Sequence, residues 1–280
     1  MNILLIGAGG REHALAWKMS QSHHCDQLFI APGNPGTASI GTNVAIDIND
    51  FKALGQLAVE KAIDLIVVGP EEPLVNGIFD FFAQNESTAH INVVGPSKNA
   101  AQLEGSKAFS KHFMQRHAIP TASYAEFTID NYEEGKQYIS NHSLPIVLKA
   151  DGLAAGKGVI IAFNHQEALA SFEEMIQHKQ FGAASSKVVI EQFLRGIELS
   201  VFVLTDGENY VVLPEAKDYK RIGENDEGLN TGGMGAVSPV PFATPKFMEV
   251  VDQKVIKPTL AGLKKEGIPY QGFIFIGLMN

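Results

Sequence analysis

Short apolar segments alternate with amphipathic segments over the first hundred residues of the chain. Ile3–Ile6, Leu28–Ile30 and Leu65–Val68 are predicted strands, and Glu12–Ser20 and Phe51–Lys61 are predicted helices. Strands that alternate with helices in this way form a parallel sheet with helices on both faces. The ligand site of such a sheet lies beyond the carboxyl ends of its strands. We therefore expect an α/β domain with its site at that edge.

The pattern changes after Pro96–Lys107, a segment enriched in Ser, Lys and Asn that we interpret as a domain boundary. Beyond it, strands are predicted at Tyr124–Phe127, Pro145–Leu148, Val159–Ala162, Val188–Leu194, Glu198–Leu204 and Gln271–Met279, and helices at Tyr132–Ser140 and Gln166–His178. Leu213–Arg221 and Asn230–Ala236 are polar and glycine-rich, so we predict long loops there. Long loops in a compact domain are commonly functional.

Composition and charge narrow the class of protein. A chain of 280 residues is long enough for about two domains. The formal net charge of -9, from 31 acidic and 22 basic side chains, makes nucleic acid an unfavourable partner. The apolar start of the chain is too short to span a membrane and has no basic region before it, so we predict a cytoplasmic protein that does not contact membranes. Cys25 has no cysteine partner and is interpreted as an incidental thiol.

The run Lys149-Ala-Asp-Gly-Leu-Ala-Ala-Gly-Lys-Gly158 lies between two predicted strands. Glycines at 152, 156 and 158 allow close approach of backbone N–H groups to an anion, and Lys149 and Lys157 add positive charge. The run is not a Walker A loop, because no Gly-Lys-Ser/Thr follows and the next residues predict a strand. It therefore predicts a flap over a nucleotide, with a glycine-rich hairpin carrying solvated lysines as the alternative.

A second glycine loop, Gly7-Ala-Gly-Gly-Arg-Glu12, follows the first predicted strand. It lacks the third glycine of a dinucleotide motif, which disfavours a Rossmann cofactor site. Gly9, Gly10 and Arg11 at a helix start suit a single phosphate, although a tight strand-to-helix turn is the alternative. Further loops at the same predicted edge are Ala31–Gly36, Gly69–Pro73 and Gly95–Ser97. Glu71 and Glu72 could bind sugar hydroxyls or place negative charge near the next helix.

Two other groups of residues are candidates for ligand contacts. Glu191, Phe193 and Leu194 at the end of a predicted strand could hold an adenine through their backbone, and Glu198 could reach a ribose. Ordinary edge-strand residues are the alternative. Asp218, Lys220 and Arg221, together with the backbone donors of Thr231-Gly-Gly, would suit a small zwitterion such as an amino acid. Solvated charges are the alternative for that group.

Four motifs together resemble the phosphoribosylamine-glycine ligase family, ATP-grasp enzymes of purine biosynthesis. The motifs are Gly7-Ala-Gly-Gly-Arg-Glu-His-Ala-Leu-Ala, Gln102-Leu-Glu-Gly-Ser-Lys-Ala-Phe, Lys149-Ala-Asp-Gly-Leu-Ala-Ala-Gly-Lys-Gly-Val and Asn230-Thr-Gly-Gly-Met-Gly-Ala. One glycine motif would be weak evidence, but four in this order span nearly the whole chain. The resemblance implies an α/β amino-terminal domain at 1–101 and an α+β ATP-grasp domain at 102–280, with a flexible lobe at about 121–188.

The resemblance also implies a reaction and a set of binding residues. Glycine's carboxylate would attack the γ-phosphate of ATP to give glycyl phosphate, and the amine of 5-phosphoribosylamine would then displace phosphate. Carried over to this sequence, the nucleotide residues are Lys107, Lys149, Gly152, Gly156, Lys157, Gly158, Glu191, Phe193, Leu194 and Glu198. The residues for phosphoribosylamine are Gly9, Gly10, Arg11, Asn34 and Glu71. Those for glycine and its acyl phosphate are Thr231, Gly232, Gly233 and Gly235, with Asp218 and Arg221 in catalytic roles.

Two departures from the family qualify these implications. Lys217 and Tyr219 replace the Gln and His found in many members. The sequence stops at Asn280 after a predicted strand for which no partner strand follows. In the family the next strand supplies the Glu and Asn that bind Mg²⁺, with Mn²⁺ as a substitute, and a further domain completes the site. We therefore expect no metal ligands within 1–280, an incomplete ATP-grasp domain, little activity, and a monomer whose exposed sheet edge could associate.

The alternatives are a non-catalytic nucleotide-binding module and another ATP-grasp carboxylate-amine ligase. Missing metal ligands favour the first of these, and the motif Asn230–Ala236 argues against the second. A dinucleotide-dependent oxidoreductase is the weakest alternative, because the first glycine motif is broken.

Overall fold

The structure is a computed structural model that describes residues 1–153, 158–228 and 230–280. The chain forms two compact units. The first contains Met1–Gln102 and the short segments Thr205–Gly207 and Gly267–Phe273. The second contains Leu103–Leu204, Glu208–Glu266 and Ile274–Asn280. The predicted boundary between 101 and 102 falls one residue before the end of the first segment of the first unit.

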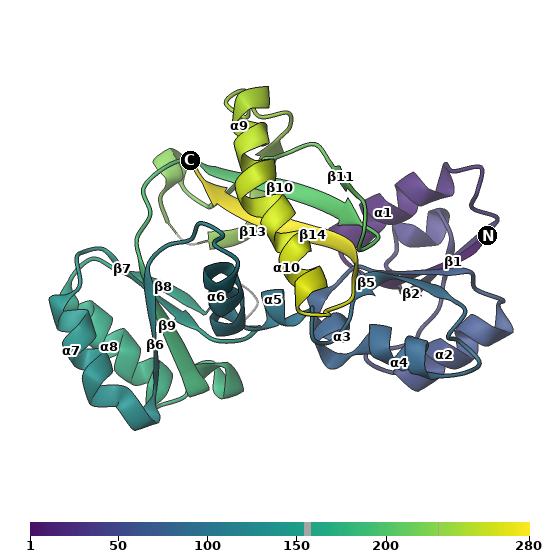
Figure 1. Ribbon diagram of the computed structural model, residues 1–280. Helices are drawn as coiled ribbons and strands as arrows, with labels where there is room; N and C mark the ends of the chain where they lie inside the picture. The colour runs from purple at the N-terminus through teal and green to yellow at the C-terminus, as the bar shows by residue number, and fades with distance from the viewer. Residues whose placement is uncertain (154–157, 229) are drawn as a thin grey trace. The chain divides into compact units, whose positions relative to one another are not determined.

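The first unit is built on a parallel sheet with the order β5-β4-β1-β2-β3 (Figure 1). Its strands are β1 (Asn2–Gly7), β2 (Gln27–Pro32), β3 (Thr42–Asn43), β4 (Leu65–Val68) and β5 (Asn92–Pro96). The start of β14 (Tyr270–Met279) pairs with β5 in the antiparallel direction. The strands β1, β2 and β4 are apolar and largely buried, as expected for a parallel sheet covered on both faces.

Helices cover both faces of this sheet because successive side chains of a strand point to opposite sides. Leu4 and Ile6 of β1 pack with residues of α2 and α4, whereas Ile3 and Leu5 pack with Ala16 of α1. The helices are α1 (Gly10–Ser20), α2 (Phe51–Glu60), α3 (Glu71–Asn76) and α4 (Ile78–Gln84), with a short 3₁₀ turn η1 (Thr37–Ser39). Since α1 follows β1 and α3 follows β4, the loops that end these strands meet at the carboxyl edge.

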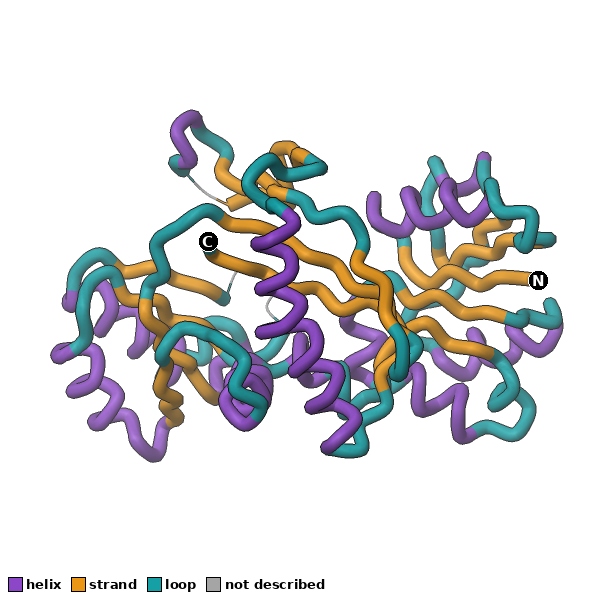
Figure 2. The backbone as a smooth tube through the Cα atoms, turned by 45° about the horizontal axis from the view of Figure 1, so that its top comes forward, coloured by secondary structure: helices purple, strands orange, loops and turns teal. Residues whose placement is uncertain are grey.

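The second unit contains an antiparallel sheet with the order β6-β9-β7-β8. Its strands are β6 (Tyr124–Thr128), β7 (Ile146–Ala150), β8 (Val159–Ala162) and β9 (Lys187–Gln192). In Figure 2, α7 (Tyr132–Asn141) and α8 (His165–Ile176) lie side by side against these strands. Phe127, Leu148, Ile139 and Phe172 form part of the buried core between the sheet and the two helices.

The second unit contains further helices and strands, and β10 and β11 among them form a strand group with the order β11-β10-β14. They are α6 (Lys107–Arg116), β10 (Glu198–Thr205), β11 (Tyr210–Val212), β12 (Lys217–Arg221), β13 (Asn230–Val237), α9 (Pro245–Val251), the π-helix η5 (Asp252–Ile256) and α10 (Lys257–Lys265). The short helix α5 (Gln102–Gly105) precedes α6. In Figure 1, α9 and α10 form one long helix through η5.

Most of the predicted elements agree with the structure, and the α/β class is confirmed. Two expectations are wrong. The segments expected as long loops form the antiparallel pair β12 and β13, in which Asp218 is opposite Ala236. Backbone hydrogen bonds hold such a pair without an apolar face, so hydropathy gave no signal. The strand expected to lack a partner also has two, because β14 lies between β10 and β5 in the sheet order, and next to it Asn280 and Ile197 exchange backbone hydrogen bonds of 2.9 and 3.0 Å.

Candidate functional site

The carboxylate of Glu12 organises the glycine loop after β1. The Gly9 N–H donates a 2.7 Å hydrogen bond to Glu12 Oε2, and Glu12 is only 4% exposed. A Cβ atom at Gly7 would lie 2.4 Å from Glu12 Cγ, and one at Gly69 would lie 2.3 Å from Glu12 Oε1. The glycines at the ends of β1 and β4 therefore make room for this side chain. The position where a dinucleotide motif has its third glycine is instead occupied by a buried helix-capping carboxylate.

Arg11 lies between two carboxylates at the same edge of the sheet. Its Nε is 2.8 Å from Glu12 Oε1, and a terminal guanidinium nitrogen is 2.8 Å from Glu71 Oε1. Burial alone lowers the pKa of Arg11, but hydrogen bonds to Glu71 and Glu12 outweigh it and raise the pKa. For Glu71, burial raises the pKa and the hydrogen bond from Arg11 more than reverses this effect, so the pKa is lowered. The structure thus brings Arg11 and Glu71 together, as sequence reasoning placed them on one edge.

Asn34 connects the loop after β2 to the loop after β1. Its Nδ2 donates to the carbonyl oxygen of Ala8 at 2.9 Å, and its Oδ1 accepts hydrogen bonds from the N–H groups of Gly36 and Thr37 at 2.8 and 3.1 Å. In the part of the chain that the structure describes, no atom beyond the chain neighbours and the backbone of α1 itself lies within 4 Å of a Cβ built on Gly10, so the start of α1 has open space. Of the two predicted glycine donors, the Gly9 N–H is therefore engaged by Glu12, and the environment of Gly10 is open.

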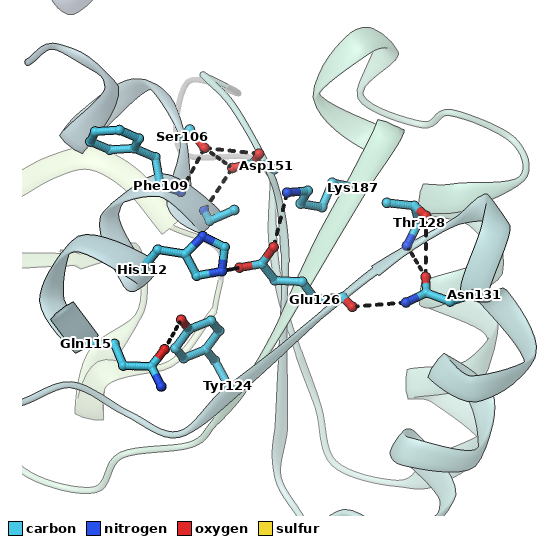
Figure 3. Close-up of polar contacts among 11 residues, drawn as sticks. Ser106, Phe109, His112, Gln115, Tyr124, Glu126, Thr128, Asn131, Asp151 and Lys187 are labelled. Carbon is cyan, nitrogen blue, oxygen red and sulfur yellow. Dashed lines mark hydrogen bonds and ion pairs between the residues drawn. The ribbon is translucent and has the colours of Figure 1, made fainter. Parts of the chain in front are cut away.

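In the second unit, the start of the glycine loop is attached to the first turn of α6. Asp151 Oδ1 accepts a hydrogen bond of 3.1 Å from Ser106 Oγ, as Figure 3 shows, and another of 3.1 Å from the Ala108 N–H. Lys107 Nζ donates to the carbonyl oxygen of Gly152 at 2.9 Å. Burial is the main reason that the pKa of Lys107 is lowered. Hydrogen bonds therefore link the start of the glycine loop both to the backbone of α6 and to the side chain of Lys107.

Two lysines share one buried carboxylate beside this loop. Glu191 Oε2 lies 3.0 Å from Lys149 Nζ and 3.1 Å from Lys111 Nζ. Lys111 and Glu191 are each 6% exposed, whereas the side chain of Lys149 is 28% exposed. Sequence reasoning placed Glu191 near the nucleoside and did not select Lys111. In the structure the backbone of Glu191 pairs with Tyr124 and Val147 on either side, and its carboxylate holds the two lysines.

The rest of the predicted flap is only partly within the described residues. Gly152 has φ +123°, a conformation that favours glycine, and the carbonyl oxygen of Gly158 accepts a 2.8 Å hydrogen bond from the Ala150 N–H. Gly156 and Lys157 lie outside the residues that the structure describes. Phe193 is half-buried and Leu194 is exposed in the connection from β9 to β10.

The residues predicted to position glycine lie on β12 and β13. Lys220 Nζ is 3.2 Å from Asp218 Oδ2 and 3.7 Å from Glu198 Oε2, so Glu198 faces Lys220. Arg221 donates to the Gly228 carbonyl oxygen at 2.6 Å. Thr231 Oγ1 donates to the carbonyl oxygen of Lys220 at 2.9 Å and accepts a 3.0 Å hydrogen bond from the Gly233 N–H. The two catalytic candidates, Asp218 and Arg221, therefore contact different partners.

Among the described residues, and apart from the immediate chain neighbours, no atom lies within 4 Å of a Cβ added at Gly232, Gly233 or Gly235, so this part of β13 has open space. Within the described ranges, no three side chains of His, Cys, Asp or Glu gather as metal ligands. These residues alone do not fit a Mg²⁺ site, and we assign no step to a metal ion. No helix in the same ranges is long and apolar enough to cross a membrane.

Comparison with known proteins defines the class. Residues 105–280 match the family described as "Phosphoribosylglycinamide synthetase, ATP-grasp (A) domain", and residues 1–104 match "Phosphoribosylglycinamide synthetase, N domain". The second unit is thus of the ATP-grasp class. The chain belongs to the phosphoribosylglycinamide synthetase family, which confirms the resemblance inferred from the four motifs.

Individual relatives agree with this assignment. Proteins named phosphoribosylamine-glycine ligase from Vibrio vulnificus and Haemophilus influenzae are 50% and 52% identical over the whole of this chain, which covers 64% of each. The crystal structure of that ligase from Thermotoga maritima has a TM-score of 0.81 and 35% identity, with 100% of this chain and 65% of that chain covered. This chain therefore spans about two thirds of the length of these relatives.

Proposed function

We propose that this chain provides the phosphoribosylamine and nucleotide sides of an ATP-dependent ligase that joins glycine to 5-phosphoribosylamine. Glycine's carboxylate oxygen attacks the γ-phosphorus of ATP, which releases ADP and forms glycyl phosphate. The amine of 5-phosphoribosylamine then attacks the acyl carbon, loses a proton and displaces phosphate to give glycinamide ribonucleotide. Relatives named for this ligation, matched along the entire chain, support the assignment.

The observation that carries the nucleotide part is the arrangement around Lys149. Phosphoryl transfer depends chiefly on positioning and on neutralising charge rather than on covalent help. Lys107 is attached to the start of the glycine loop, and Lys149 is held by Glu191 with part of its side chain exposed. Both ammonium groups would contact ATP phosphates, with Gly152, Gly156, Lys157 and Gly158 in the covering loop. The adenosine would lie near Glu191, Phe193, Leu194 and Glu198.

The two substrates would bind to residues from different parts of the chain. The phosphate of 5-phosphoribosylamine would bind at Gly9, Gly10 and Arg11, and its sugar near Asn34 and Glu71. Because Arg11 contacts two carboxylates, this phosphate would have to displace at least one of them from the guanidinium. Glycine and glycyl phosphate would contact Asp218, Arg221, and the open backbone at Thr231, Gly232, Gly233 and Gly235.

Mg²⁺, or Mn²⁺ in its place, would neutralise charge on the ATP phosphates when bound. The protein is proposed to be a cytoplasmic monomer that binds neither nucleic acid nor membranes. Relatives extend beyond the matched region, so we propose that residues 1–280 alone have little turnover. The alternative of a non-catalytic nucleotide-binding module is favoured by the lack of a metal-ligand cluster in the described residues.

Calorimetric titration with ATP, with and without Mg²⁺, tests the nucleotide site. ADP release that requires both glycine and 5-phosphoribosylamine tests the ligation. Binding of ATP that barely depends on Mg²⁺, with little substrate-dependent ADP release, is the expected result for residues 1–280. Failure to bind ATP would reject the proposal. Nucleotide binding combined with complete lack of substrate-dependent ADP release, even in a chain of the relatives' full length, would favour the non-catalytic module.

A further inference from the structure

Lys111 is a buried ammonium group whose hydrogen bonds are directed inward. Its Nζ donates to Thr121 Oγ1 at 2.8 Å and to the carbonyl oxygen of Ala122 at 3.3 Å, and it lies 3.1 Å from Glu191 Oε2. A lysine ammonium has three N–H donors. These three contacts account for all of them, and the residue is 6% exposed. Lys111 is therefore placed to act on its neighbours rather than to contact a ligand directly.

The neighbour on which Lys111 acts is Glu191, and through it Lys149. Both ammonium groups contact the same oxygen atom, Glu191 Oε2. If Glu191 contacted only Lys149, the two side chains would form a neutral pair, and the positive charge of Lys149 would be cancelled. The second ammonium restores one positive charge to the group. Among the described residues, the side chain of Lys149 makes one hydrogen bond, to Glu191 Oε2, so its ammonium group has further N–H donors for a ligand.

Helix and sheet geometry fix this arrangement. Lys107 and Lys111 are four residues apart on α6 and so share one face of the helix. Lys149 and Glu191 lie on the adjacent strands β7 and β9, where Glu191 is paired with Val147. A side chain from the helix and one from the sheet thus meet at one carboxylate. Burial lowers the pKa of Lys111, and the carboxylate of Glu191 opposes this effect.

We propose that Lys111 is a positioning residue for the nucleotide phosphates: it neutralises Glu191, so that Lys149 is held in place and keeps its full positive charge for ATP. This inference rests on the proposed function, because it assumes that Lys149 contacts ATP phosphates. It goes further in assigning a role to a residue with no direct ligand contact. The role is electrostatic, so it predicts opposite effects for removal of the cation and removal of the anion.

The test is calorimetric binding of ATP, ADP and adenosine to the 280-residue chain and its variants. Lys111→Met should weaken ATP binding by roughly tenfold or more, as expected for a unit charge lost several ångströms from the phosphates. Adenosine, which has no phosphate, should bind with unchanged affinity. Lys111→Arg should retain most of the ATP affinity. Lys136→Met, at an exposed lysine paired with Glu133 on α7, is the matched control for net charge and should leave ATP binding unchanged.

The double variant Lys111→Met with Glu191→Gln separates the electrostatic role from a structural one. It removes one positive and one negative charge and leaves Lys149 with its full charge, so ATP affinity should recover relative to Lys111→Met. Equal loss of ATP and adenosine binding in Lys111→Met, or no recovery in the double variant, would overturn the inference. Absence of ATP binding by the unmodified chain would instead reject the proposed function. Melting temperatures of all variants identify any that fail to fold, and the double variant, in which neither position 111 nor position 191 carries a charge, then provides the comparison with the unmodified chain.

Discussion

The two units arrange charge in opposite ways. In the first, one guanidinium contacts two carboxylates, since Arg11 is 2.8 Å from both Glu12 and Glu71. In the second, one carboxylate contacts two ammonium groups, those of Lys111 and Lys149. A phosphate at the first site must compete with the protein's own anions, whereas a phosphate at the second meets uncompensated positive charge. Basic residues in a glycine motif thus indicate an anion site only when their partners are known.

The two charge arrangements also differ in how far their side chains are buried. The side chains of Arg11 and Glu71 are 53% and 47% exposed, so water and salt weaken their interaction. Lys111 and Glu191 are buried, and loss of one partner would leave an uncompensated charge in a poorly solvated place. The contact between Arg11 and Glu71 can therefore open at low energetic cost, whereas the contacts of Glu191 with Lys111 are a fixed part of the fold.

The largest effect is expected from Gly7→Ala, which disturbs the support of the first arrangement. Gly7 has φ +131°, and an added Cβ would lie 2.4 Å from Glu12 Cγ. Strain and displacement of Glu12 should lower the free energy of unfolding by about 2–4 kcal/mol. Urea denaturation measures this loss. Gly10→Ala is the control, because no described residue beyond its chain neighbours and its own helix backbone lies within 4 Å of its Cβ position; equal effects of the two substitutions would contradict the packing argument.

Lys149→Met should remove most of the positive charge that the second arrangement offers to a nucleotide. A charge-assisted hydrogen bond contributes about 1.5–3 kcal/mol, so ATP affinity should fall by roughly 10- to 100-fold. Calorimetry measures the change, and Lys136→Met serves as the control at an exposed lysine. If ATP bound equally well to Lys149→Met, the nucleotide site would have to lie elsewhere in the chain.

The fold could be predicted where buried strands alternate with amphipathic helices. The strand predicted at Leu65–Val68 has the bounds of β4, and Phe51–Lys61 differs from α2 by one residue. The buried positions of such elements can be predicted from the local hydropathy pattern. The pair β12 and β13 carries no such signal, since its stability lies in backbone pairing between polar segments. Pairing of Asn280 with Ile197 could not be foreseen either, because strand partners depend on the path of the chain.

The candidate site could be predicted as a set of loops but not as a set of contacts. Glycine spacing predicted loops whose backbone could approach an anion, which stays a prediction, and Arg11 and Glu71, which are in contact in the structure, were both selected. Lys111 was missed, although its spacing of four residues from Lys107 would place both on one helical face. The contact between Lys111 and Glu191 joins an unpredicted helix to a strand far along the chain. Local pattern carries no information on that pairing.

Glu71→Gln should leave the guanidinium of Arg11 with less compensating negative charge, as Lys149 is in the second unit. It removes one of the two carboxylates that contact Arg11, so a phosphate would compete with Glu12 alone. We expect ribose 5-phosphate to bind about two- to fivefold more tightly, in keeping with the small free energy of exposed ion pairs. Glu72→Gln removes the same charge from α3 at a residue that contacts Asn49, and should have less effect. Weaker binding in Glu71→Gln would mean that Glu71 contacts the sugar more strongly than it restrains Arg11.

The smallest expected effect is the pH dependence that Glu71 gives to stability. The pKa of Glu71 is lowered from 4.5 in the folded chain: burial acts against this shift, and the hydrogen bond from Arg11 overcomes it. The folded state therefore binds fewer protons than the unfolded state, and the stabilisation is present above the unfolded pKa and lost as the pH falls through the folded pKa. Since Glu71 is about half exposed, the gain is less than about 1 kcal/mol. Urea denaturation at several pH values should give the unmodified chain a larger free energy of unfolding than Glu71→Gln at pH 7. This difference in free energy should shrink below pH 4.5. A difference that grows on acidification would show that the Arg11 contact does not stabilise the charged carboxylate.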